Sequence, residues 1–430
     1  MGWRNEVSEE WRRRRALDPS GSRYPLGGAT FDEREIIEAV DVLLSGQITM
    51  SSRVAAFEKR FAEAVGAPHA VMVNSGSSAN LLALAALADP LRLRQGRPSL
   101  PPGSDVLVPA VCWSTSVWPI VQVGCRPVFV DVDPKTLNVD VEDVRRRITS
   151  STRAIVAVHV LGNCADLGAL RKLVLERDLL LVEDTCEALG SKALIPEYGR
   201  FDLGTFGNFG TYSFYYSHHI TTGEGGMVVC QDEADADRLR SLRAHGWARD
   251  GRVERTAKER ENPGIDPRFL FVRQGFNVRP TEIQAAFGLI QIERLLEMNV
   301  ARVHNRAAVV RAVWEHPIWH GQFTFAEASP GVDPAWFGLS MMLVPKYQHR
   351  REAFASYLTR FGIENRPIVS GNFLRQPAAR ERDFGDPKLF PGAEAVHERG
   401  IFIGLSPVRM SSERVEWLAD AIMSYFKEGW

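Results

Sequence analysis

Short apolar runs and stretches of helical spacing follow one another along the chain from about Pro25. The apolar runs predict strands at residues 70–73, 105–109, 127–130, 154–158, 179–182, 211–214 and 226–230. Helical spacing is seen at residues 35–44, 79–88 and 167–176. Strands that alternate with helices favour a mainly parallel sheet with helices on both faces. We therefore expect an α/β fold with a mainly parallel sheet.

The last third of the chain predicts a smaller α+β unit. Residues 280–313 predict one long helix or a broken pair, with Pro280 in the first turn and Asn277 favoured over Arg279 as the cap. Strands at 336–344 and 401–403 and helices at 351–361 and 411–426 are expected beyond it. These patterns predict an N-terminal extension over 1–27, a large domain over 28–290 and a small domain over 291–430. The charged residues 249–267 predict a long surface loop, of a kind that often covers enzyme sites.

Composition narrows the class of protein. The chain has 430 residues, 45% of them hydrophobic, and a net charge of -1, which predicts neither a nucleic-acid nor a membrane partner. Its five cysteines form no CxxC pair and predict reduced thiols in a cytoplasmic protein: Cys112, Cys125, Cys164, Cys186 and Cys230. The charged N-terminus, with Arg12 to Arg15 in a row, lacks the apolar core of a signal peptide. That arginine run is expected to be the solvated end of a helix.

A Ser/Gly-rich segment, Asn74 to Ser78, lies between a predicted strand and a predicted helix. Gly76 permits a tight turn, and free N–H groups at the start of a helix attract anions. Ser77 and Ser78 add hydroxyl donors. The segment predicts a phosphate site, although a plain helix cap explains the same residues.

Two further candidates follow predicted strands, where open α/β sheets bind their ligands. Asp184 could pair with a protonated pyridine nitrogen and make that ring an electron sink, or it could cap a helix. Glu187 follows three residues later. Trp113 could stack on a flat cofactor ring, or it could be an ordinary core tryptophan.

A polar strip between two apolar runs, Thr211 to Gly226, has His218 and His219 at its centre. Neighbouring residues face different ways, so one histidine can be catalytic without the other. Surface or capping histidines remain the alternative. The glycines at 223–226 are not followed by Gly-Lys-Ser/Thr, so they do not form a nucleotide-binding loop.

Together these motifs resemble the DegT/DnrJ/StrS sugar aminotransferase family, which uses pyridoxal phosphate (PLP). The matching stretches are residues 74–80, 127–133, 183–184 with 188–190, 211–226 and 275–286. The resemblance implies the PLP-dependent fold type I and a homodimer with active sites at the subunit interface. By position, it implies that the cofactor phosphate is bound by Gly76, Ser77, Ser78 and Ser213, with Asn277 reaching it from the partner subunit. It also implies Asp184 at the pyridine nitrogen, Trp113 against the ring and Glu187 near the ring hydroxyl.

Most members of that family have a lysine where His218 stands, and this lysine forms a Schiff base with PLP. The paired histidines, with residues 161–163, 336–338 and 371–377, resemble the lysine-lacking 3-dehydratases of nucleotide-linked 4-keto-6-deoxyhexoses. One branch of these enzymes carries a [2Fe-2S] cluster on cysteines after the histidine loop and works with a reductase. No cysteine follows Cys230 here, so we expect no cluster.

The resemblance implies a dehydratase that holds its cofactor noncovalently. An amino donor such as glutamate would convert PLP to pyridoxamine phosphate (PMP), and His218, with a pKa near 6.5, would act as the base. Arg366 and Arg375 are expected at the nucleotide diphosphate, or in surface salt bridges. His219 is expected beside the substrate or in a structural role. An aminotransferase-like PMP enzyme, a catalytically silent partner subunit and a separate reductase partner remain open.

Overall fold

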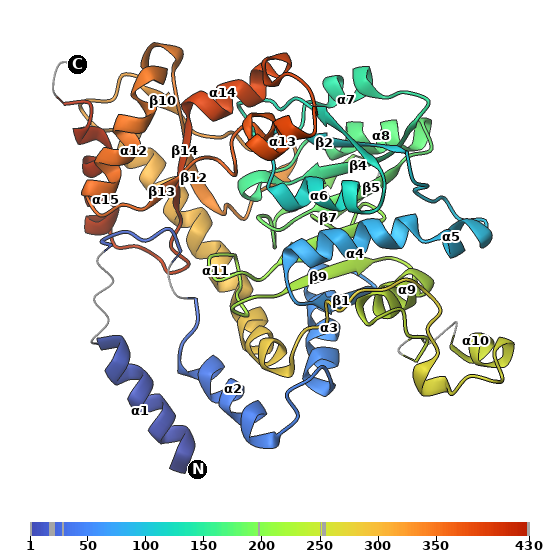
Figure 1. Ribbon diagram of the computed structural model, residues 1–430. Helices are drawn as coiled ribbons and strands as arrows, with labels where there is room; N and C mark the ends of the chain where they lie inside the picture. Colours follow the sequence, from blue (N-terminus) through green and yellow to red (C-terminus); the bar gives the residue numbers. More distant parts are fainter. Residues whose placement is uncertain are drawn as a thin grey trace.

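Residues 2–16, 22–27, 30–196, 198–249, 251 and 255–427 are described in a computed structural model (Figure 1). A seven-stranded sheet forms the centre of the larger part. Its strands, in spatial order, are β1 (His69–Val73), β9 (Gly226–Cys230), β8 (Phe209–Ser213), β5 (Leu180–Asp184), β4 (Thr152–Val158), β2 (Asp105–Pro109) and β3 (Arg126–Val130). Only β9 runs antiparallel to its neighbours in this sheet. The predicted α/β fold with a mainly parallel sheet is confirmed.

Helices cover both faces of this sheet. Strands such as β2 and β9 are therefore buried along their whole length. One face packs on α4 (Gly76–Ala88), α6 (Ser114–Gln122) and α9 (Glu233–Arg243). The opposite face packs on α3 (Ser52–Val65), α7 (Val141–Arg147), α8 (Leu167–Glu176) and α11 (Glu282–Trp314). A short α5 (Pro90–Arg94) follows α4, and α2 (Glu33–Ser45) lies against α11.

The smaller part contains a second, antiparallel sheet, drawn from orange to red in Figure 1. Its strands, in spatial order, are β10 (Phe323–Thr324), β12 (Gly338–Leu343), β14 (Gly400–Gly404) and β13 (Asn365–Arg366). Its helices are α12 (Arg351–Arg360), α13 (Pro377–Glu381), α14 (Pro391–Arg399) and α15 (Ser412–Ser424), with short 3-10 turns at Pro345–Arg350, Phe373–Arg375 and Pro387–Leu389. α11 packs on α2, α3 and α15, so one helix joins the two parts.

A third, three-stranded sheet ties the chain after α11 back to the larger part. It consists of β11 (Val332–Asp333), β6 (Lys192–Ile195) and β7 (Gly199–Asp202). The predicted domain boundary between residues 290 and 291 falls inside α11. The three-domain division itself remains a prediction.

Several local predictions differ from the structure. α11 is a single helix, and its cap is Thr281, which forms a reciprocal capping box with Gln284. Pro280 therefore precedes the helix, and Asn277 is not its cap. The predicted loop 249–267 contains a two-turn helix, α10 (Arg255–Glu261), which the pairs Arg255–Glu259 and Lys258–Glu261 support.

The N-terminal residues Gly2–Ala16 form α1, which packs along α2 (Figure 1). Arg4 bonds Glu38 and Asp41 on α2, and Arg12 pairs with Glu33. Arg12 to Arg14 are exposed in the last turn of α1, as predicted for the arginine run; nothing is described of the Arg15 side chain. No helix of the described residues combines the length and the apolar character needed to cross a membrane.

Candidate active site

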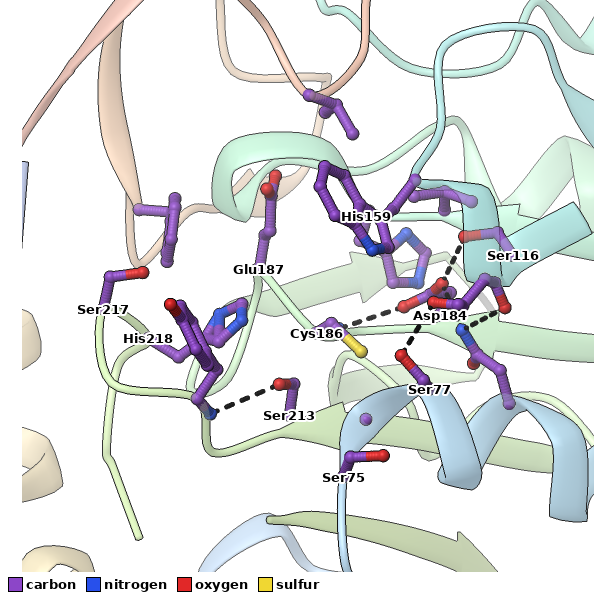
Figure 2. A pocket seen from close by; sticks show the side chains of 18 of the residues that line it. Ser75, Ser77, Ser116, His159, Asp184, Cys186, Glu187, Ser213, Ser217 and His218 are labelled. Carbon is purple, nitrogen blue, oxygen red and sulfur yellow. Dashed lines mark hydrogen bonds between the residues drawn. The ribbon is translucent and has the colours of Figure 1, made fainter. Parts of the chain in front are cut away.

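A cavity of about 440 Å³ opens at the carboxyl edge of the large sheet, beside the first turn of α4 (Figure 2). Strands β4, β5 and β8 all end at this edge, as expected for a ligand site in an open α/β sheet. The larger part supplies most of the lining: Ser75, Gly76, Ser77, Asn80, Trp113, Thr115, Ser116, Val158, His159, Asp184, Cys186, Glu187, Ser213, Tyr215, Ser217, His218 and Glu224. Leu26 and five residues of the smaller part complete it: Phe337, Arg366, Pro367, Val369 and Phe402.

Asp184 ends β5 with its carboxylate buried and fixed. Asn80 Nδ2 and Ser116 Oγ both donate to Oδ2, at 2.8 and 2.7 Å. The backbone N–H of Cys186 donates to Oδ1 over a longer distance, 3.3 Å, and the Cys186 thiol also hydrogen-bonds the carboxylate. Asn80 is itself held, because Thr211 Oγ1 donates to its Oδ1 at 2.6 Å. The network leaves Oδ1 as the oxygen available to a ligand in the cavity.

The start of α4 forms the floor of the cavity. Ser75 caps the helix by accepting from the N–H of Ser78, so the N–H groups of Gly76 and Ser77 remain free at the first turn. Gly76 has no room for a side chain, because a Cβ there would lie 2.5 Å from Ser213 Cβ. Free N–H groups and serine hydroxyls at a helix start form a site for an anion.

The loop between β8 and β9 carries His218 at its tip. Phe214 closes the loop at its base, donating to Gly225 O and accepting from the N–H of Thr222. The His218 ring lies 5.3 Å from the Phe337 ring and 6.0 Å from the Tyr215 ring, centroid to centroid. Burial and the nearby Arg302 charge lower the pKa of His218 to about 3. The imidazole is therefore neutral throughout the physiological range, instead of titrating near 6.5 as the sequence suggested.

Glu187 is a second titratable group of the cavity. One carboxyl oxygen accepts from the N–H of Leu161 at 2.9 Å, and no cation pairs with it among the described residues. Burial is the main cause that raises the pKa of Glu187 to about 7, and the Asp184 charge adds to it. The group can thus carry a proton at neutral pH.

His159 and Glu183 form a buried pair beside the cavity that was not predicted from the sequence. The Glu183 carboxylate accepts from His159 Nε2 at 3.0 Å and from the N–H groups of Gly204, Phe206 and Gly207. Burial opposes ionisation of Glu183, but these donors outweigh it and lower its pKa. The carboxylate orients the His159 ring through Nε2, and Nδ1 is buried with no hydrogen-bond partner among the described residues.

Most predicted site residues meet at this cavity. It is lined by Gly76, Ser77, Trp113, Asp184, Glu187, Ser213, His218 and Arg366. Trp113 is 58% exposed at the lip, which differs from the core-tryptophan alternative. Ser78 lies behind the lining as part of the α4 cap, and its hydroxyl accepts from Ser75 Oγ.

Three predicted site residues do not line this cavity. His219 is buried with Nε2 2.6 Å from Ala335 O, which corresponds to its structural alternative and not to a substrate contact. Arg375 lines a separate cavity of about 340 Å³, where Glu394 and Glu398 pair with its guanidinium, so the salt-bridge alternative holds there. Asn277 lies outside the cavity of its own chain and accepts from Arg279.

The residues that support Asp184 had only weak signals in the sequence. Asn80 stands inside a motif that resembles the family, but Ser116 and Thr211 are distant from it in the chain. All three reach Asp184 or its partner because α4, α6 and β8 meet beside the end of β5. A polar residue at one predicted helical or strand position gives no hint of such a partner.

Known proteins share this fold and much of this sequence. The sequence profile of the DegT/DnrJ/EryC1/StrS aminotransferase family matches residues 29–423. GDP-4-keto-6-deoxy-D-mannose 3-dehydratase of Escherichia coli O55:H7 is 35% identical over 93% of this chain and 99% of its own length. dTDP-4-dehydro-2,6-dideoxy-D-glucose 3-dehydratase of Saccharopolyspora spinosa is 33% identical over 93% of this chain and 85% of its own length.

Solved structures agree in fold. A crystal structure of GDP-4-keto-6-deoxymannose-3-dehydratase with bound GDP-perosamine superposes with a TM-score of 0.82, at 34% identity, covering 93% of this chain and 100% of that one. A second structure of that enzyme, with a trapped PLP–glutamate geminal diamine, gives the same TM-score, identity and coverage.

Proposed function

The chain belongs to the DegT/DnrJ/EryC1/StrS aminotransferase family, and we propose that it is a PLP/PMP-dependent 3-dehydratase of a nucleotide-linked 4-keto-6-deoxyhexose in deoxysugar biosynthesis. The single observation that carries the proposal is a neutral histidine, His218, in a cavity whose other groups suit a pyridine phosphate. The dehydratase relatives, at 33 to 35% identity over 93% of the chain, support the reaction class.

The residues present fit the cofactor. A pyridinium nitrogen needs a fixed carboxylate, and Asp184 offers Oδ1 while Asn80 and Ser116 hold Oδ2. A phosphate needs donors without a blocking side chain, and the α4 start offers these at Gly76 and Ser77. Trp113 has the exposed indole face that stacking requires. We assign Ser213 to the phosphate and Glu187 to the ring hydroxyl on the same basis.

When bound, the cofactor supplies an amino group and a ring that accepts an electron pair. His218 cannot form the stable imine that a lysine forms, so its imidazole is left to move protons. A neutral imidazole accepts a proton and can return it to the C3 hydroxyl as that group departs. Ligand phosphates in the same cavity favour the imidazolium, which raises the pKa of His218 from its low value. Phe337 and Tyr215 lie against the ring on two sides and support its position.

The net reaction balances without a metal cluster. The C3 hydroxyl leaves as water, and hydrolysis that frees the amino nitrogen as ammonia consumes water, so no water is formed or used overall. Glutamate or a similar donor supplies the two electrons and is oxidised to its keto acid. The product is a 4-keto-3,6-dideoxyhexose. The absence of cysteines after Cys230 supports this two-electron route.

The finer features of the proposal concern assembly and partners. We propose a homodimer in which Asn277 reaches the phosphate in the partner subunit's site, and Arg366 as the contact for the nucleotide diphosphate. A GDP-linked sugar is the first substrate to test, because it is the substrate class named for the 35% identical relative. A cytoplasmic location and the question of a separate reductase stay at the level of prediction.

Purified protein incubated with PMP and GDP-4-keto-6-deoxy-D-mannose tests the function. Mass spectrometry should find a sugar nucleotide that has lost the C3 oxygen, and His218→Asn should form none while it still binds PMP. A stable amino sugar would instead indicate an aminotransferase. Absence of turnover with GDP-, dTDP- and CDP-linked 4-keto sugars would favour the catalytically silent alternative.

A further inference from the structure

The loop that carries the two histidines rests on a buried arginine of α11. Arg302 donates from its two terminal nitrogens to the backbone carbonyls of His218 and His219, each at 3.4 Å. We propose that Arg302 is a positioning residue for the reaction, which fixes the backbone of His218 and keeps its imidazole unprotonated. The inference rests on the proposed function only for its catalytic consequence, because the placement and protonation of His218 can be measured without turnover.

The geometry of this contact is that of a fork. A guanidinium group holds its donors in one rigid plane, so binding two successive carbonyls fixes the direction of the peptide unit between them. His219 Nε2 holds the same segment from the other side through Ala335 O. With both attachments made, His218 is the histidine that faces the cavity, and His219 is the one that does not.

The charge of Arg302 is unusual because no carboxylate neutralises it. The residue is only 3% exposed, and no carboxylate of the described part of the chain acts on its charge. Burial lowers the pKa of Arg302 to about 10, so the group is still charged at neutral pH. An uncompensated positive charge next to the imidazoles of His218 and His219 opposes their protonation. Burial and then this charge are the causes of the low pKa of His218.

Other charged groups surround His218, and Arg302 is the one whose charge lowers the pKa of His218. Glu187, Glu224, Asp184 and Arg366 line the same cavity, Tyr215 and His219 lie on the loop itself, and Arg306 follows Arg302 by one turn on α11. The carboxylates favour the imidazolium, so the positive charge of Arg302 acts against them. Arg306 lies on the Trp336 ring, with its guanidinium carbon 3.9 Å from the centroid, and donates to Ala326 O.

Arg302 belongs to a polar face of α11 that binds backbone carbonyls around the cavity. Asn299 donates to Leu189 O, just after Glu187, and Asn305 donates to Ser406 O and Val408 O in the smaller part. The spacing of three residues puts these side chains on one face of the helix. Arg302 is the member of this face that reaches the catalytic loop.

Titration of His218 by ¹⁵N NMR on histidine-labelled full-length protein tests the proposal, with the signal assigned by its loss in His218→Asn. Arg302→Met should move the onset of His218 protonation to higher pH by about one pH unit, because the repelling charge is removed. Arg302→Lys should keep the titration of wild type yet lose roughly tenfold in kcat, because an ammonium cannot bind both carbonyls. The acid limb of the pH–rate profile should shift to higher pH in Arg302→Met and keep its wild-type position in Arg302→Lys.

Arg306→Met is the matched control, since it removes a half-buried arginine one turn further along the same helix, whose contacts are to Trp336 and Ala326 and not to the loop. Its His218 titration should equal that of wild type. If Arg302→Met does not fold, Arg302→Gln, which keeps one donor, is titrated in its place.

Superimposable His218 titrations in wild type and the uncharged variant would overturn the claim that the Arg302 charge keeps His218 unprotonated. Full kcat in Arg302→Lys would overturn the claim that Arg302 positions the His218 backbone. A wild-type protein that turns over no sugar would refute the proposed function and leave the titration result standing.

Discussion

At the scale of single residues, the proposed chemistry depends on the position of His218. The ring lies in the cavity with Asp184, Ser213 and Ser77, and the resemblance predicts that it takes the place of the family's lysine. An imidazole moves protons but forms no stable imine, whereas a lysine amine does both. The proposed function therefore assigns the difference between amino transfer and elimination to this side chain and not to the residues around the cofactor.

His218→Lys should restore covalent attachment of the cofactor. We expect a shift in PLP absorbance and a mass increase after borohydride reduction, because a lysine amine at this position reaches the bound aldehyde. Arg366→Lys, which puts a lysine elsewhere in the same cavity, is the control and should trap little cofactor. An unmodified His218→Lys chain after reduction would mean that the cofactor ring does not lie beside this position.

Glu187 makes a pH-dependent contribution to stability. Its pKa is about 7 in the folded chain and about 4.3 when unfolded. Between these values the folded state binds more protons than the unfolded state, so stability falls as the pH rises through this window. Glu187→Gln should remove that loss and gain roughly 3–4 kcal/mol over wild type at pH 8 but not at pH 4. Denaturant unfolding at both pH values checks this, and an equal difference at the two would exclude a protonated Glu187.

Sequence could place residues at the cavity where a motif is local. Asp184, Gly76 and Ser77 stand next to strand ends or a helix start, so their position in the lining could be predicted from their neighbours, and their roles stay predictions. Arg302 had no such signal, because a lone arginine in a helical stretch usually indicates a solvent-exposed residue. Its function depends on a loop more than 80 residues earlier in the chain.

At the scale of elements, the close contact between α4 and β8 shapes the anion site. Gly76→Ala would put a Cβ 2.5 Å from Ser213 Cβ and 3.1 Å from Cys186 Sγ. The overpacking should cost about 1–3 kcal/mol in stability and displace the helix start from the phosphate position. We expect weaker PMP binding by fluorescence titration together with the lower stability.

Gly264→Ala is the control for that variant, because a Cβ at residue 264 would have no atom within 4 Å and the backbone there is not left-handed. It should leave both stability and PMP affinity unchanged. Tight PMP binding by Gly76→Ala would argue against the α4 start as the phosphate site.

Element types were predictable because their periodicity is strong, and element ends were not. Strands β2 and β9 and helix α8 match the predicted ranges residue for residue. The cap of α11 was misassigned because Pro280 suggested a first turn, whereas the Thr281–Gln284 capping box starts the helix after it. The sequence predicts a loop where α10 lies, because exposed ion pairs stabilise this helix and it has no apolar face to produce a helical pattern.

At the scale of the whole molecule, the cavity collects residues from both parts of the chain, and one proposed residue comes from a second copy. If Asn277 serves the partner subunit's site, each dimer combines two chains in each site. Mixed dimers of His218→Asn and Asn277→Ala chains would then contain one site with both residues intact and one with neither.

Co-refolding or co-expressing the two variants tests this arrangement. At limiting PMP, activity should return to about a quarter of wild type, because half of the dimers are mixed and each has one intact site. Activity no greater than the average of the two separate variants would mean that Asn277 acts within its own chain or not at all. Each variant alone, carried through the same procedure, is the control.

The fate of the amino nitrogen tests the central claim most directly. Wild-type protein is supplied with PLP, ¹⁵N-glutamate and GDP-4-keto-6-deoxy-D-mannose, and the label is followed by NMR and mass spectrometry. We predict ¹⁵N-ammonia, 2-oxoglutarate and a 4-keto-3,6-dideoxyhexose in equal amounts. Retention of ¹⁵N in a sugar that keeps its C3 hydroxyl would contradict the proposed dehydration.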